Sequence, residues 1–223
     1  GLRATFMPKP FYNLTGNGCH VHASLWDLKK KKNYFLDIDN ELGLSKMGYH
    51  FIGGIMKSVD SFSAWFNPSL NSYDRLNART TNSGSTYSPT AVTYSGNNRT
   101  HMIRIPDKGR IEFRPADGAA NPYLLQAGLI AMGLDGIKAK RNPGKKIDIN
   151  MYSQGHKLKR IKKLPQSLME SLNKFKASDV VRKSIGSKVV SHYIKLKKRE
   201  IAEHNKVSEE NKKAWERKNI IDC

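Results

Sequence analysis

The sequence has few cysteines and no long apolar run. Only Cys19 and Cys223 occur among 223 residues, and they lie at opposite ends of the chain. This spacing excludes a disulfide framework and a CxxC zinc site. No apolar stretch approaches the roughly 18–20 residues that a membrane span needs, and no secretory leader pattern is present. We therefore expect a cytoplasmic protein without a membrane partner.

Acidic residues are also scarce, with 19 Asp and Glu against 39 Lys and Arg, which gives a net charge of +20. Such a charge is typical of proteins that bind nucleic acids or anionic surfaces. Most of the excess lies in residues 138–223, which carry 24 basic and 9 acidic residues. These are mostly lysines scattered along helical segments, with few aromatic residues for base stacking. We expect a solvated lysine-rich surface, and nucleic-acid binding is the alternative.

The spacing of apolar residues predicts strands and helices in mixed order, which favours an α+β fold over a doubly wound parallel sheet. Residues 19–26, CHVHASLW, alternate like a strand. Apolar residues three and four positions apart between Leu42 and Phe66 predict a long helix, ended by Asn67-Pro68. Further strands are expected at 91–95, 101–105 and 110–114, a long loop at 75–90, a buried helix from Asn121 to Ile137, and lysine-rich helices at about 165–176, 178–185 and 187–218.

Two histidines and a serine share one face of the first predicted strand. His20, His22 and Ser24 alternate with apolar residues, and the histidines would lie about 6–7 Å apart along the strand. A His-x-His pair is compatible with metal binding, but it is equally compatible with polar side chains on a solvent-exposed face. The pair alone does not decide between these interpretations.

A second polar cluster is richer in charge. Arg99, Arg104, Arg110 and Arg114 surround Glu112 in the sequence. Arginine matches the geometry of carboxylate and phosphate groups, so the cluster predicts an anionic substrate with more than one charged group. Glu112 is either a salt-bridged strand residue or a metal ligand kept ionised by its neighbours. The other acids considered as ligands are expected to be caps and surface residues: Asp37, Asp39, Glu41, Asp117 and Asp135.

Six ordered motifs cover nearly the whole chain. They are ATFMPKPF (4–11), GNGCHVHAS (16–24), NPSLNSYDRL (67–76), NNRTHMIRIP (97–106), RIEFRPADGAANPYL (110–124) and GLDGIKAK (133–140). Through these motifs the sequence resembles the C-terminal catalytic portion of the glutamine synthetase family. The stretch that begins GSTYSPTAV makes it most similar to the branch called type III glutamine synthetase or γ-glutamylmethylamide synthetase.

The resemblance implies a fold, a reaction and partners. Residues 1–145 would form part of the family's catalytic domain, an antiparallel sheet with flanking helices. Residues 146–223 would form its lysine-rich helical C-terminal part. The implied reaction uses ATP and Mg²⁺ or Mn²⁺ to convert the γ-carboxylate of glutamate to an acyl phosphate, which ammonia or methylamine then displaces. A ring-shaped homo-oligomer, a dodecamer, is also implied.

The resemblance also assigns roles to individual residues. It implies metal binding by His20 and Glu112, glutamate binding by Gly16, Arg75, Arg99 and Arg114, catalysis by Arg99, and ATP binding by His22, Ser24, Arg104 and Lys108. Two positions depart from the family pattern. Tyr87 stands where a flap glutamate is usual, and Thr15 stands where an asparagine is common.

The family's remaining metal carboxylates and its small N-terminal domain have no counterpart in the sequence. We therefore expect a C-terminal fragment that is inactive alone.

Overall fold

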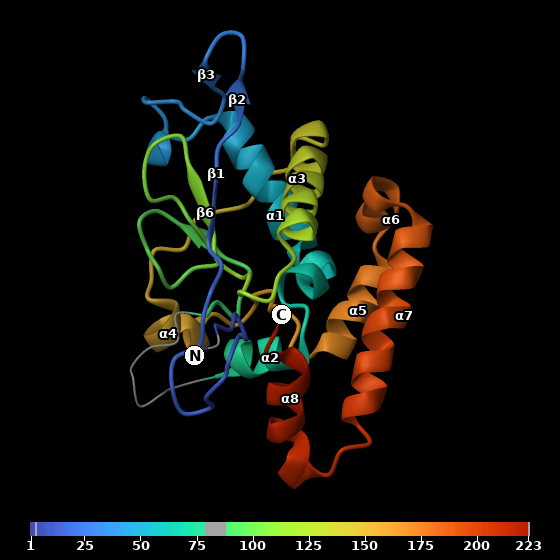
Figure 1. Cartoon of the computed structure of the whole chain (residues 1–223). Helices are drawn as coiled ribbons and strands as arrows, with labels where there is room; N and C mark the ends of the chain where they lie inside the picture. The colour runs from blue at the N-terminus through green and yellow to red at the C-terminus, as the bar shows by residue number, and fades with distance from the viewer. Residues whose placement is uncertain (3, 79–87, 223) are drawn as a thin grey trace.

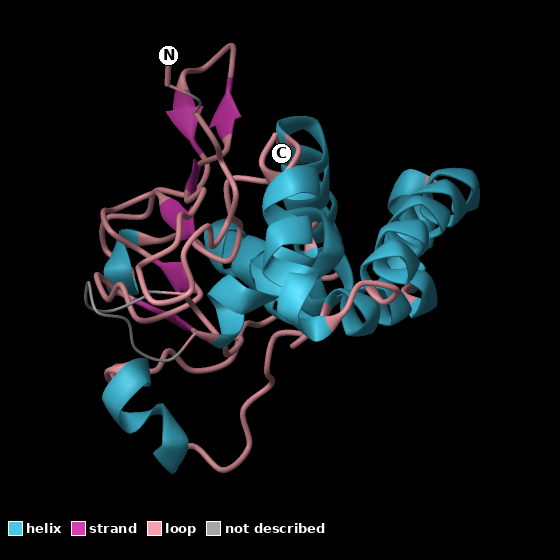
Figure 2. Ribbon diagram, turned by 60° about the horizontal axis from the view of Figure 1, so that its bottom comes forward, coloured by secondary structure: helices cyan, strands magenta, loops and turns pink. Residues whose placement is uncertain are grey.

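The computed structural model describes residues 1–2, 4–78 and 88–222, with the strands on one side and most helices on the other (Figure 1, Figure 2). The main sheet has the order β1-β6-β5-β4. Its strands are β1 (Val21–Ala23), β6 (Ile111–Phe113), β5 (Ile103–Arg104) and β4 (Tyr94–Ser95). A separate hairpin pairs β2 (Trp26–Asp27) with β3 (Lys32–Asn33). The predicted α+β fold is confirmed.

The main sheet is mixed rather than wholly antiparallel. Both β1 and β5 run antiparallel to β6, but β4 runs parallel to β5. The compact loop 96–102 returns the chain to the level at which β4 began, so that β5 runs in the same direction as β4. Ile103 N and Ile105 N can then donate to Thr93 O and Ser95 O, each at 3.0 Å. This short return, which has no strand-like pattern, adds one parallel pair, β4 with β5, to a sheet whose other pairs are antiparallel, as the resemblance implied.

Two long helices form the centre of the helical side. Helix α1 (Lys46–Phe66) is capped by Ser45 Oγ, which accepts from Gly48 N at 3.2 Å, and it ends at Asn67 as predicted. It begins later than Leu42, because a 3₁₀ turn, η1 (Glu41–Gly43), precedes it. Side-chain oxygens at helix N-caps satisfy backbone donors that would otherwise lack partners.

Helix α3 (Pro122–Lys138) starts after Asn121, whose side chain caps it, and crosses α1 at very short range. A Cβ on Gly54 of α1 would lie 2.0 Å from Met132 O, and one on Gly136 would lie 2.2 Å from His50 O. Glycine therefore allows the two backbones to touch. The expectation that α3 is wholly buried was wrong, because Tyr123, Ile130 and Leu134 are exposed on its outer face.

The C-terminal helices are α4 (Met151–Gln154), η2 (Gly155–Lys157), α5 (Leu168–Ala177), α6 (Asp179–Ile185), α7 (Ser187–His204), η3 (Glu209–Asn211) and α8 (Lys212–Ile220). Of these, α5, α6 and α7 add buried residues to the same core. Phe175 of α5 and Tyr193 of α7 both pack on Trp65, with ring centroids 5.3 and 6.2 Å away. Residues from before and after position 145 thus share one core, while the boundary at 145 stays a prediction.

The single helix expected at 187–218 is in fact two helices. The chain leaves α7 at Asn205 and turns back through η3, so α8 lies against α2 (Leu70–Asn77) rather than extending α7 (Figure 1). No proline or glycine marks this break. It is recognisable only from the contacts that α8 makes after the turn.

Helix α2 also corrects the loop expected at 75–90, because Arg75 to Asn77 are helical. Ser69 caps this helix in a reciprocal arrangement with Ser72. The usual capping box has Glu or Gln at the second position, so the signal was easy to miss. Most of the expected loop, including Tyr87, lies outside the described residues.

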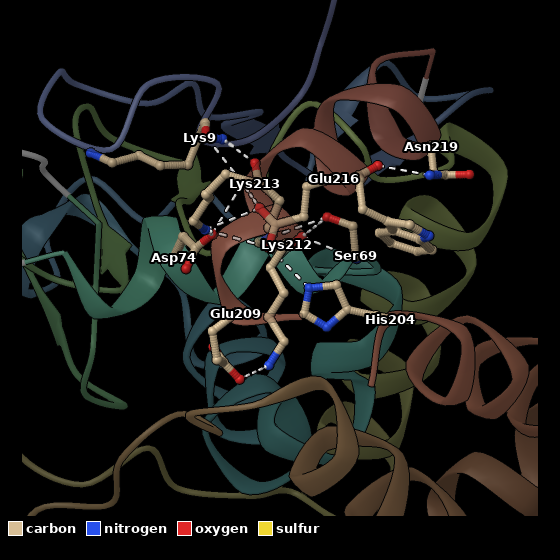
Figure 3. Close-up of polar contacts among 12 residues, drawn as sticks. Lys9, Ser69, Asp74, His204, Glu209, Lys212, Lys213, Glu216 and Asn219 are labelled. Atoms are coloured by element: carbon tan, nitrogen blue, oxygen red, sulfur yellow. Dashed lines mark hydrogen bonds and ion pairs between the residues drawn. The ribbon is translucent and has the colours of Figure 1, made fainter. Parts of the chain in front are cut away.

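Buried polar contacts connect α8, α2 and the N-terminal segment (Figure 3). Asn71 of α2, 1% exposed, accepts from Lys9 N at 2.6 Å and donates to Lys9 O at 3.0 Å. Its amide also donates to Glu216 Oε2 of α8 at 3.2 Å. Lys213 Nζ reaches both Asp74 (2.6 Å) and Glu216 (3.1 Å). Asn71 is therefore the point at which three separate segments meet.

No helix in the described ranges is long and apolar enough to cross a membrane.

Replacing Asn71 with Ala should lower the free energy of unfolding by about 1–3 kcal/mol, because buried groups of Lys9 and Glu216 lose their partner. A urea midpoint measured by circular dichroism tests this. The matched control is Asn219→Ala, since Asn219 is exposed and bonds only within α8. The Asn219→Ala substitution should change the free energy of unfolding by no more than about 0.5 kcal/mol. Equal midpoints for the two variants would show that the Asn71 contacts do not stabilise the fold.

Candidate functional site

Strand pairing places three predicted site residues in one row. The register sets His22 of β1 opposite Glu112 of β6, and Glu112 opposite Arg104 of β5. Residues paired in this way point to the same face of a sheet. The neighbouring row, which includes Phe113 and Ile103, points the other way and is fully buried in the core. The alternation predicted for the first strand is confirmed, and it directs the polar row away from the core.

Glu112 is the anion at the centre of this face. Its Oε2 accepts from Arg104 Nη1 and its Oε1 from Arg114 Nη1, each at 2.9 Å, and the residue is 3% exposed. Burial raises the pKa of the Glu112 carboxyl. The hydrogen bond from Arg104 and the charge of Arg114 outweigh that effect and hold the pKa below its ordinary value. Glu112 is thus an ionised carboxylate shared by two guanidinium groups.

His20 lies beside this pair as a neutral imidazole. Its Nδ1 is 3.2 Å from Glu112 Oε1 and 3.4 Å from Arg114 Nη1. Burial and the charge of Arg114 lower the pKa of His20 to about 4, although Glu112 acts in the opposite direction. His20 Nδ1 and Glu112 Oε1 therefore lie side by side next to the guanidinium group of Arg114.

Arg75 reaches this site from α2. It is 4% exposed and donates from Nη1 to Pro115 O at 2.8 Å. A Cβ on Gly18 would lie 3.1 Å from both Arg75 Nη2 and His20 Nε2, so the glycine lets the two side chains converge. Burial lowers the pKa of Arg75, and the charge of Asp117 opposes the shift. Arg75, predicted to begin a loop, is instead held rigidly by a helix.

The position of Asp117, whose negative charge lies near Arg75, was predicted wrongly from the sequence. Asp117 was expected to be a cap or surface residue, but it is fully buried and accepts from Asn67 Nδ2 at 3.0 Å. Burial raises its pKa, and the charge of Arg75 and the bond from Asn67 oppose this. Its short-range neighbours are Pro115, Ala116 and Gly118, which resemble an ordinary turn. Only the fold brings it beside Arg75.

Asn97 was also missed. Arg104 donates to Asn97 Oδ1 from Nε at 2.8 Å and from Nη2 at 2.6 Å, while its Nη1 holds Glu112. The fork of Arg104 is therefore fixed from two sides. The asparagine lies within the motif NNRTHMIRIP, but no feature of its spacing distinguishes it from a turn residue.

The structure brings only two of the four clustered arginines to Glu112. Arg110 pairs instead with Asp107, and Arg99 is exposed in a turn without an ion pair to any described residue. The expectation that all four surround Glu112 was therefore wrong in detail. Strand alternation predicts that Arg110 shares a face with Glu112, but its position at the strand end leaves it free to turn toward the preceding loop.

The other predicted residues lie around the row with different contacts. His22 is half-exposed, with Nε2 3.9 Å from Glu112 Oε1. Ser24 Oγ accepts from Trp26 Nε1 at 2.8 Å.

Lys108 is exposed, and its aliphatic carbons cover Gly43. A Cβ on Gly16 would lie 2.3 Å from Pro8 O, so this glycine is required by the close approach of the N-terminal segment.

Two side chains of the site, His20 and Glu112, are possible ligands of a metal ion. His20 Nδ1 and Glu112 Oε1 are close enough to bind one ion, and Arg114 Nη1 already places a positive charge beside both. A neutral imidazole and an ionised carboxylate suit a divalent cation. Among the described residues, however, no group of three His, Cys, Asp or Glu side chains could hold a metal. The chain thus offers a fitting pair of ligands rather than a complete site.

The α+β domain presents two guanidinium groups around one carboxylate, with a neutral imidazole beside them. Guanidinium groups match the geometry of carboxylate and phosphate anions. The model of the family "Glutamine synthetase, catalytic domain" matches residues 1–219. The chain belongs to the glutamine synthetase family, as the motifs predicted.

Individual relatives agree with this assignment. The chain is 52% identical over 200 residues to a glutamine synthetase of Rhizobium meliloti, covering 90% of this chain and 46% of that protein. It is 39% identical over 209 residues to a glutamate–methylamine ligase of Methyloversatilis universalis, covering 92% and 46%.

Among solved structures, "GmaS/ADP complex-Conformation 1" is similar with a TM-score of 0.86 and 46% identity, covering 99% of this chain and 50% of that one. The chain thus spans about half the length of the relatives it matches. These similarities support the branch inferred from the motifs, type III glutamine synthetase or γ-glutamylmethylamide synthetase.

Replacing Glu112 with Gln should lower the free energy of unfolding by about 3–5 kcal/mol, because two guanidinium groups lose a buried partner. The matched control is Asp107→Asn, which breaks the exposed pair with Arg110 and should cost no more than about 1 kcal/mol. Urea unfolding of both variants measures the difference. A Glu112→Gln protein as stable as the control would mean that Glu112 does not hold the cationic face together.

Proposed function

We propose that the protein containing this chain is an ATP-dependent glutamate–amine ligase. The γ-carboxylate of glutamate attacks the terminal phosphorus of ATP, giving γ-glutamyl phosphate and ADP. An amine then attacks the carbonyl carbon and expels phosphate. The observation that carries the proposal is the convergence of Arg75, Arg104 and Arg114 around the carboxylate of Glu112 and the imidazole of His20. Substrate and nucleotide together bring several negative charges that such a face can neutralise.

The family resemblance assigns roles to the arginines, and their surroundings are compatible with these roles. Arg75 and Arg114 are buried and fixed, which suits the binding of the small glutamate carboxylates. Arg104 is held by Asn97 and Glu112 but remains partly accessible, which suits a contact to ATP phosphates. Arg99 is exposed and would turn toward glutamate and the transferred phosphoryl group as the catalytic residue. Lys108 would contact phosphate from the same side.

The polar residues of β1 complete the proposed site. His22 and Ser24 would contact the nucleotide, and Gly16 would border the glutamate pocket. His20 and Glu112 would supply two ligands to Mg²⁺ or Mn²⁺, and their remaining partners would be water, substrate oxygens or residues outside the described ranges. Such an ion, when bound, neutralises phosphate charge during transfer.

The acceptor is a small amine, either ammonia or methylamine. Relatives named for each acceptor are similar to this chain, so the acceptor is to be decided by measurement. We further propose that the whole protein acts in the cytoplasm as a ring-shaped homo-oligomer, a dodecamer. These statements depend on family membership and on the absence of a membrane-spanning helix in the described chain.

A coupled assay of ADP release by the full-length protein, with glutamate and ATP, tests the function. We expect turnover that depends on glutamate and on added ammonium or methylamine, with much slower turnover for ethylamine. The preferred of the first two amines identifies the acceptor. An absence of glutamate-dependent ADP release with every amine would rule out the proposed function.

In the same assay, Arg75→Lys should raise the KM for glutamate by about 10–100-fold, because losing a charge-assisted hydrogen bond costs about 1.5–3 kcal/mol. The KM for ATP should change less than about two-fold. The control Arg110→Lys alters an arginine that pairs away from the site and should leave both constants unchanged. An active Arg75→Lys enzyme with the original KM for glutamate would remove Arg75 from the pocket.

A further inference from the structure

The C-terminal helices enclose a surface groove that the proposed reaction does not use. It has a volume of about 570 Å³ and is lined by Lys176, Arg182, Ser187, Val190, Ser191, Ile194, Lys195 and Lys198. Its position between α5, α6 and α7 is far from β1 and β6, with α1 and α3 between them (Figure 1). The groove is therefore separate from the candidate catalytic face.

One helix provides most of this groove. The lining residues of α7 lie at positions 187, 190, 191, 194, 195 and 198, the three- and four-residue spacing of a single helix stripe. The half-buried Ile194 forms the accessible apolar floor, because Val190 is only 5% exposed and belongs to the core, while Lys195 and Lys198 stand at the edge and are exposed. Apolar floor and cationic edge thus run side by side along the helix.

The charge around the groove has one sign. Four of its eight lining residues are Lys or Arg, and none is acidic. Arg182 is partly neutralised by Asp179. Elsewhere on α7, Lys197 and Arg199 pair with Glu200 and Glu203. Within the described residues, Lys176, Lys195 and Lys198 have no ion pair. The cations at this edge are therefore available to a negatively charged ligand.

The side chains that line the groove favour some classes of anionic ligand over others. A single-stranded nucleic acid is usually bound by aromatic side chains that stack on its bases, and no aromatic residue lines this groove. An apolar floor between cations instead matches a helix with apolar residues on one face and acidic residues beside them. Helix-in-groove recognition of this kind uses apolar anchors at three- and four-residue spacing, and the acidic flanks add electrostatic complementarity.

We propose that the groove binds an acidic amphipathic helix of a partner protein. The apolar residues of the partner cover Ile194 and the aliphatic carbons of the lysines beside it, and its carboxylates pair with Lys176, Lys195 and Lys198. This assigns part of the lysine excess of the C-terminal segment to recognition and leaves the remainder as solvated surface.

The probe is a fluorescein-labelled 20-residue peptide with Leu at helical three- and four-residue spacing and Glu on the flanking positions. Its binding to the full-length protein is measured by fluorescence anisotropy at physiological salt. A second peptide keeps every Glu but has Ser at each Leu position. We expect saturable binding of the first peptide, and binding of the second at least ten-fold weaker.

Two variants test whether the Leu-containing peptide binds in the groove. Lys195→Glu combined with Lys198→Glu reverses the charge at the edge, and Ser191→Trp fills the groove without changing charge. Each should weaken binding of the Leu-containing peptide at least ten-fold. The control, Lys29→Glu combined with Lys30→Glu, makes the same charge change at exposed lysines between β2 and β3. It should alter binding less than two-fold, and all variants should give the wild-type circular dichroism spectrum.

Several results would overturn the proposal. They are no saturable binding to the full-length protein, equal binding of the two peptides, or equal loss in the Lys29/Lys30 control. Tighter binding of a single-stranded oligonucleotide or of anionic lipid vesicles, with the same sensitivity to the groove variants, would assign the groove to those ligands instead. The ligase assay is independent of this test, because no groove residue belongs to the candidate catalytic site.

Discussion

The candidate site depends on the salt bridges that the Glu112 carboxylate forms with Arg104 and Arg114. Two guanidinium groups approach it at 2.9 Å in a setting that water barely reaches. Without that anion the positive charges of Arg104 and Arg114 would repel each other at low dielectric, where such forces are strong. With it, both side chains are fixed by a hydrogen bond to the same carboxylate. The same carboxylate, with His20, supplies a pair of atoms suited to a divalent ion.

The rest of the fold holds that carboxylate in place. The register of three strands places Glu112 between His22 and Arg104, and the opposite row of the same strands is buried in the core beside α1 and α3. A shift of one residue would turn Glu112 into the core and expose Phe113. Helix α2 adds Arg75 from another direction, and α8 anchors α2 through Asn71. Elements distant in the sequence thus fix one small polar face.

Local patterns in the sequence predicted most elements and part of the site. Alternation predicted the polar face of β1, and helical spacing predicted α1 with its end at Asn67 and α3 with its start at Asn121, because these signals act between near neighbours. The motifs predicted Arg75, Arg104, Arg114, His20 and Glu112 as one site. Spacing alone could not reveal that Asp117 lies buried beside Arg75, that Asn97 fixes Arg104, or that α8 turns back after α7. Each of these depends on contacts between distant segments, and such contacts leave no local period in the sequence.

Transfer of labelled oxygen tests the central claim most directly. The full-length protein is incubated with ATP, the accepted amine and glutamate carrying ¹⁸O in its γ-carboxylate, and the released phosphate is analysed by mass spectrometry. If γ-glutamyl phosphate forms and the amine displaces phosphate from it, one ¹⁸O atom appears in phosphate for each amide made. Amide formation with unlabelled phosphate would contradict the account, because the carboxylate oxygen would then never have bonded to phosphorus.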